Sequence, residues 1–137
     1  MEFQNQLNDL QKLNLSAGQY MVVGSGALSV RNIRESEDVD VIVTQELWNE
    51  LSKKHSVSTN SWGIENIVLE KDIEILNPAQ SIFGNSEVVP IEEMFKKADV
   101  FEGVAFINLD HLRKIKIKLG REKDLEDVRS IDAYLRA

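Results

Sequence analysis

Two aspartates lie one residue apart inside an apolar run of the sequence. Asp38 and Asp40 flank Val39, and the run continues to Val43. In a strand, residues two apart face the same side, so both carboxylates would project together. Two carboxylates held this close repel each other unless a cation lies between them, and Mg²⁺ binds such oxygens together with water and phosphate. The pair therefore suggests a metal site, although two solvated acids at a strand end would give the same pattern.

A glycine turn precedes the two aspartates. Gly24, Ser25 and Gly26 follow the apolar run Tyr20 to Val23 and open a segment with helical spacing. Free N–H groups at a helix start favour phosphate, glycine lets the backbone approach a ligand closely, and Ser25 adds a hydroxyl donor. The turn is neither a P-loop nor a dinucleotide fingerprint, because it lacks both the Gly-Lys-Ser/Thr and the G-x-G-x-x-G patterns. Its position before the acid pair predicts a phosphate site beside a metal site.

A third acid is expected, because a metal site of this kind needs further ligands and a base for an attacking hydroxyl. Glu74 lies between Ile73 and Ile75 in an otherwise apolar run, which a purely buried strand does not explain. Asp72 lies on the same strand face as Glu74 and is the alternative third ligand. The candidate metal ligands are thus Asp38, Asp40 and Glu74.

Composition limits the class of protein. The 137 residues fit one domain, 1–137, that can bury a core without cysteine, and the absence of cysteine excludes disulfides and thiolate zinc sites. No apolar run is long enough for a membrane span and the N-terminal segment lacks the parts of a signal peptide, so a cytoplasmic protein is expected. The net charge of -7 disfavours general nucleic-acid binding. The segment from Arg113 to Lys123 is nonetheless basic, and is either a solvated helix face or an anion-binding face.

Hydrophobic periodicity predicts alternating helices and strands. Helices are expected at residues 2–13, 27–33, 45–54, 90–97, 109–119 and 122–135, and strands at 20–23, 39–43, 57–59, 66–69, 73–76 and 104–107. In the last helix, Leu125, Val128, Ile131 and Leu135 form one apolar stripe. His55 and His111 are expected at the surface. The mixture indicates an α/β (α+β) fold with a small mixed β-sheet flanked by helices and with helices at the C-terminus.

These motifs together resemble the polymerase-β-type nucleotidyltransferase superfamily. The resemblance rests on Gly24-Ser25, twelve residues, Asp38-Val39-Asp40, and the apolar-acid-apolar element around Glu74. The C-terminal segment is similar to that of the small bacterial members, in which a lysine precedes an arginine and then Lys-Asp. Here these residues are Lys116, Arg121, Lys123 and Asp124.

The resemblance implies roles for these residues. Asp38, Asp40 and Glu74 would hold two Mg²⁺ ions, and Glu74 would help to activate the acceptor. Gly24 and Ser25 would bind the phosphates of ATP or another nucleoside triphosphate. Lys116, at the edge of its helix's apolar stripe, would reach across to the turn and neutralise the departing pyrophosphate. Arg121 is a further candidate for binding phosphate, and Lys123 and Asp124 either bind or only pair with neighbours.

The acceptor is left open by the sequence. Minimal members of the superfamily include antitoxins that transfer AMP to a partner toxin and domains that modify tRNA, so the expected acceptor is a hydroxyl of a protein or of tRNA. A partner toxin or a second copy of the chain is a possible binding partner. The alternative to an enzyme is a degenerate, antitoxin-like module that binds nucleotide or protein without transfer.

Overall fold

The structure is a computed structural model that describes residues 2–84 and 87–137. In this part of the chain the strands are β1 (Tyr20–Val23), β2 (Val39–Val43), β3 (Ser58–Thr59), β4 (Glu65–Leu69), β5 (Ile73–Leu76), β6 (Asp99–Phe101) and β7 (Val104–Phe106). The helices are α1 (Glu2–Lys12), α2 (Ser25–Ser29), α3 (Gln45–Lys54), α4 (Ile91–Lys96), α5 (Leu109–Leu119) and α6 (Glu122–Arg136). The mixed α/β architecture expected from the sequence is confirmed.

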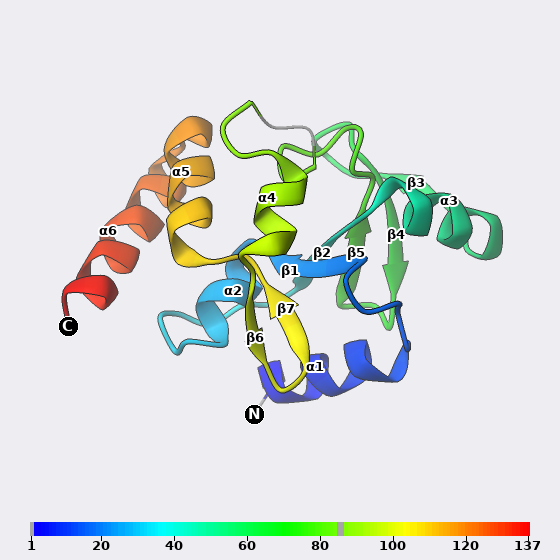
Figure 1. Cartoon of the computed structure of the whole chain (residues 1–137), viewed down its shortest axis with the longest axis horizontal. Coiled ribbons are helices and arrows are strands. Elements are labelled where there is room, and N and C mark those ends of the chain that lie inside the picture. Colours follow the sequence, from blue (N-terminus) through cyan, green and yellow to red (C-terminus); the bar gives the residue numbers. More distant parts are fainter. Residues whose placement is uncertain (1, 85–86) are drawn as a thin grey trace.

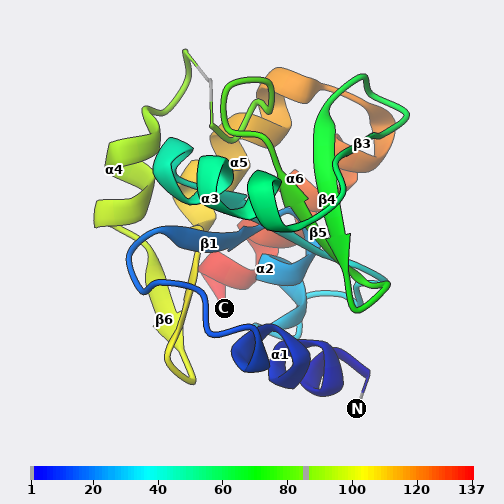
Figure 2. The same cartoon turned by 90° about the vertical axis from the view of Figure 1, so that its right-hand side faces the viewer.

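The strands form one mixed sheet in the order β3-β4-β5-β2-β1-β7-β6. β2 lies near its centre, antiparallel to β1 and parallel to β5. Helices cover both faces: Figure 2 shows α3 and α4 on one side of β1, and α1 and α2 on the other. The C-terminal helices α5 and α6 lie side by side at the end of the molecule opposite α3 (Figure 1). No helix in the described part of the chain is long and apolar enough to cross a membrane.

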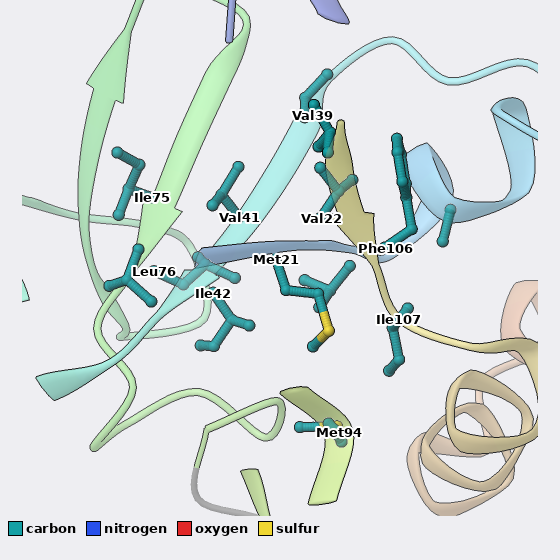
Figure 3. Close-up of a cluster of buried hydrophobic side chains, with 14 of the residues drawn as sticks. Met21, Val22, Val39, Val41, Ile42, Ile75, Leu76, Met94, Phe106 and Ile107 are labelled. Carbon is teal, nitrogen blue, oxygen red and sulfur yellow. The ribbon is translucent and has the colours of Figure 1, made fainter. Parts of the chain in front are cut away.

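The core explains the continuous apolar runs of the central strands. Met21 and Val22 of β1 point to opposite faces and are both fully buried (Figure 3). On the face of Met21 lies Met94 of α4, and on the other face Phe106 packs against Phe3 of α1 with ring centroids 6.4 Å apart. A strand buried on both faces needs apolar residues at every position, so a polar residue such as Asp40 in β2 stands out.

Most element boundaries agree with the sequence prediction, and helix ends are set by local capping. Thr44 caps α3 by accepting a hydrogen bond from the Leu47 N–H, Asn108 caps α5 in the same way, and Gly120 ends α5 in the left-handed conformation. The short helix expected over 27–33 is present, but as α2 it begins and ends earlier, at Ser25 and Ser29. The strand β6 was not predicted.

Two expectations about the C-terminal helices need correction. Leu125 and Leu135 are exposed, whereas Val128 and Ile131 are buried, so the buried stripe of α6 is narrower than its sequence suggested. Asp124 and Asp127 of α6 are buried instead of Leu125 and Leu135. His111 is buried rather than on the surface, whereas His55 is exposed as expected.

Candidate active site

Asp40 and Glu74 are direct neighbours across two parallel strands. The register of β2 and β5 pairs Asp40 with Glu74, one step after Val39 and Ile73. Both acids are half-buried, and both lie on the sheet face opposite the buried side chains of Val39 and Ile73. The strand register therefore brings together two acids that are far apart in sequence.

The other two candidate acids lie just outside the strands. Asp38 is exposed and precedes β2, while Asp72 precedes β5 and its carbonyl accepts a hydrogen bond from the Val39 N–H at 2.8 Å. Asp38 is close enough to the pair for its charge to raise the pKa of Asp40. In residues 2–84 and 87–137, however, no three acids or histidines converge into a ready metal site.

Negative charge at this site is only partly compensated. Burial, followed by the charges of Glu74 and Asp38 and a hydrogen bond with Glu74, raises the pKa of Asp40 to about 7, against a smaller lowering by Lys116. Partial desolvation likewise raises the pKa of Asp38, followed by the charges of Asp72 and Glu37. Carboxylates that resist ionisation for these reasons fit a divalent cation, which would supply the missing positive charge.

Two asparagines fix the carboxylate of Glu74. Its Oε2 accepts hydrogen bonds from Asn60 Nδ2 at 3.0 Å and from Asn66 Nδ2 at 2.6 Å. Sequence reasoning missed both residues, although Asn66 was visible as a polar residue inside a strand. The two amides hold one oxygen of Glu74 in a defined position on the face shared with Asp40.

The glycine turn lies directly against Asp40. Gly24 has φ of +66°, and a Cβ at this position would lie 3.1 Å from Asp40 Oδ2. The turn thus needs glycine both for its backbone conformation and for the space beside the carboxylate. The Ser25 hydroxyl lies 2.9 Å from that of Ser36, which itself donates to the Asp38 carbonyl, so the turn is also tied to the segment before β2.

Lys116 is buried rather than free at the edge of α5. Its Nζ lies 2.9 Å from Asp127 Oδ2 and 3.5 Å from Asp124 Oδ1, and both of these acids are buried. Arg34, from the segment that leads into β2, also contacts Asp127, at 2.7 Å. Two acids of α6 thus hold the Lys116 side chain, while its charge also acts on Asp40, and its expected role toward the phosphates stays a prediction.

Arg121 is the basic residue that reaches the cavity beside the acids. It donates to Asp124 at 2.5 and 2.9 Å, and its guanidinium carbon lies 4.5 Å from the ring centre of Trp62. Lys123 is exposed, whereas Asp124 pairs with both Lys116 and Arg121. Of the basic residues in this segment, Arg121 is the one whose side chain lines the cavity beside the acids.

A cavity of about 350 Å³ lies beside Asp40, Glu74 and Arg121, and its volume is within the range of small-molecule sites. Its lining includes both acids of the pair, the hairpin between β3 and β4, the loop after β5 and the junction of α5 and α6: Asp40, Asn60, Trp62, Ile64, Glu74, Phe83 and Arg121. A larger cavity of about 780 Å³, bordered by Thr44, Pro78 and Phe95, contains none of the candidate residues.

The order of the strands in the mixed sheet and the helices on both of its faces define a nucleotidyltransferase-like fold. The structure is similar to a crystal structure from Thermotoga maritima of a protein provisionally assigned as a nucleotidyltransferase. The TM-score is 0.57 with 18% sequence identity, and the match covers 92% of this chain and 91% of that one. No family model matches the sequence, and no curated protein matches it significantly. At this identity the similarity establishes the fold alone.

Proposed function

We propose that this protein is a metal-dependent nucleotidyltransferase that transfers a nucleoside monophosphate, AMP in the first instance, to a hydroxyl group. The observation that carries the proposal is the contact of the Gly24 turn with Asp40, which is itself paired in register with Glu74. A phosphate-binding turn beside two carboxylates is the arrangement that phosphoryl chemistry requires, because the catalytic work is mostly positioning and charge stabilisation.

In this reaction the acceptor oxygen attacks the α-phosphorus, the bond to the β-phosphate oxygen breaks, and pyrophosphate leaves with that oxygen. The backbone of Gly24 and Ser25 would bind the phosphates. Glu74, held by Asn60 and Asn66 through Oε2, would accept the acceptor's proton on its other oxygen. Arg121, which lines the cavity beside Trp62, would contact the nucleotide from the side of α5 and α6.

Asp40, Glu74 and Asp38 are the residues that would hold Mg²⁺. The donor set suits a hard cation, and the raised pKa values of both aspartates indicate that a positive charge is missing there. When bound, the metal supplies Lewis-acid stabilisation of phosphate charge. Asp72 stays the alternative ligand in this proposal, because its charge also acts on Asp38.

A labelling experiment tests the proposed transfer and identifies the acceptor. Purified protein, Mg²⁺ and each α-labelled nucleoside triphosphate are added to a lysate of the source cells, and the labelled product is treated with protease or ribonuclease. Label sensitive to protease indicates a protein acceptor, such as a partner toxin, and label sensitive to ribonuclease indicates an RNA such as tRNA. The Asp40→Asn variant is the control, and we expect it to lose transfer completely. Equal labelling by Asp40→Asn and the unmodified protein would contradict the proposal.

A second candidate function is nucleotide or partner binding without transfer. The observation that favours it is the lack of a converged three-acid cluster in the described residues, with one oxygen of Glu74 already bound to two amides. A measurement of metal-dependent pyrophosphate release distinguishes transfer from binding alone. A binding-only module would bind the nucleotide but release no pyrophosphate.

A further inference from the structure

The cavity beside the acids has an aromatic wall that the proposed chemistry does not use. Trp62 lines this cavity and is 64% exposed, whereas Trp48, the chain's other tryptophan, is buried in the core. An exposed indole loses the favourable burial that tryptophan usually gains, so its place at a ligand-sized cavity needs an explanation.

Trp62 is held in place by an ordered turn. Asn60 Oδ1 accepts hydrogen bonds from the Trp62 N–H at 2.9 Å and from the Ile64 N–H at 3.1 Å. The backbone closes the same turn, with Gly63 N–H donating to the Asn60 carbonyl and Asn60 N–H donating to Ile64. The indole is thus carried by a preorganised hairpin tip.

The same asparagine connects this tip to the acid pair. Asn60 uses Oδ1 for the turn and Nδ2 for Glu74, so one side chain fixes the position of Trp62 relative to the carboxylates. On the other side, Arg121 lies over the Trp62 ring and is itself held by Asp124. Two elements from distant parts of the chain thereby hold the aromatic wall at a fixed distance from the acids.

We infer that Trp62 binds the base of the nucleotide by stacking, and that Arg121 supports this platform. Ile64 and Phe83 complete an apolar lining beside the acids, which suits the flat face of a nucleobase. The phosphates would then lie at the Gly24 turn and the base at Trp62, with Asp40 and Glu74 between them. The inference rests on the proposed function, because it takes the ligand of this cavity to be a nucleotide.

The test compares ATP with inorganic tripolyphosphate, which has the phosphates but no base. Affinities are measured by calorimetry in Mg²⁺ for the unmodified protein, Trp62→Leu and Trp62→Phe. Stacking on an aromatic ring contributes enough affinity for Trp62→Leu to bind ATP about tenfold more weakly, while its affinity for tripolyphosphate stays the same. Trp62→Phe keeps a ring and should retain most of the affinity for ATP. ATP should also quench tryptophan fluorescence in the unmodified protein and not in Trp62→Phe.

Tyr134→Leu is the matched control, because Tyr134 is another exposed aromatic residue, at the far end of α6. It should leave both affinities unchanged. If Trp62→Leu binds ATP as tightly as the unmodified protein, the base does not stack on Trp62 and the inference is overturned while the proposed function stands. If Trp62→Leu loses affinity for both ligands equally, its role is structural and the inference is also overturned. If the unmodified protein binds neither ligand, the proposed function itself fails.

Discussion

Asp40 carries the largest pKa change of the candidate acids, and this change makes the stability of the metal-free protein depend on pH. Its pKa in the folded protein is about 7, raised by burial and then by Glu74 and Asp38. An aspartate in an unfolded chain titrates near about 3.9. The folded protein therefore keeps a proton that the unfolded chain releases in this interval. The corresponding stability is fully present below about pH 4 and is lost as the pH rises through about 7.

The first prediction follows from this loss of stability with rising pH. We expect Asp40→Asn to leave the free energy of unfolding nearly unchanged at about pH 3, where Asp40 is mostly protonated in both the folded and the unfolded state. At about pH 8 the substitution should raise it by about 1–3 kcal/mol, because a neutral amide replaces a repelled charge. Urea unfolding in the presence of a chelator measures both values. An equal effect at the two pH values would mean that the repulsion is absent.

The second prediction concerns Gly24. Gly24→Ala places a Cβ 3.1 Å from Asp40 Oδ2 on a backbone with φ of +66°, and should cost about 1–2 kcal/mol of stability and most of the transfer activity. Gly103→Ala is the matched control, since Gly103 has φ of +79° and open space around it. The control should lose similar stability and keep its activity. Loss of activity in both variants would point to the fold rather than to the site.

Among the helices and strands, the sequence predicted the sheet strands and the long helices well, because hydrophobic period and local caps decide them. The pairing of Asp40 with Glu74 could be expected only as a hypothesis, since it depends on the register of β2 and β5. Asn60 lies 14 residues from Glu74 in the sequence, and Trp62 lies far from Arg121 in the sequence. No local sequence pattern therefore indicates either contact. The burial of Lys116 was missed because its partner Asp127 lies on the next helix.

The third prediction concerns the buried ion pairs that join α5 to α6. Lys116 lies between Asp124 and Asp127, and burial raises the pKa of Asp127, but hydrogen bonds from Arg34 and Lys116 outweigh it and leave the pKa lowered. Lys116→Met leaves two buried carboxylates short of a partner, which should cost about 3–5 kcal/mol. Denaturant unfolding measures the loss.

Lys118→Met is the control for the third prediction, because Lys118 is on the same helix but exposed. It should change stability by less than about 0.5 kcal/mol. Adding Asp127→Asn to Lys116→Met should recover part of the loss, since it removes one of the unpaired charges. Equal losses for Lys116→Met and Lys118→Met would show that the buried pairs contribute little.

For the molecule as a whole, the candidate site is assembled from parts that only the fold brings together. The turn after β1, the strands β2 and β5, the hairpin between β3 and β4, and the junction of α5 and α6 all contribute to it. A ligand that spans these parts binds the folded chain and not the unfolded one. Its binding energy therefore appears as thermal stability.

The last prediction is that Mg²⁺ and ATP raise the melting temperature together by more than the sum of their separate effects. The acid pair repels the triphosphate until a cation lies between them, so each ligand should strengthen binding of the other. At about one hundred times the dissociation constant, binding adds about 2.7 kcal/mol of stability, which corresponds to a rise of several degrees in a domain of this size. The rise in melting temperature with both ligands should be larger at about pH 8 than at about pH 6, because a proton on Asp40 competes with the metal.

The Asp40→Asn variant should lose the part of this rise that exceeds the sum of the separate effects, and should keep the smaller rise that ATP alone produces. Additive shifts in the unmodified protein at both pH values would contradict a metal site shared by Asp40 and the nucleotide.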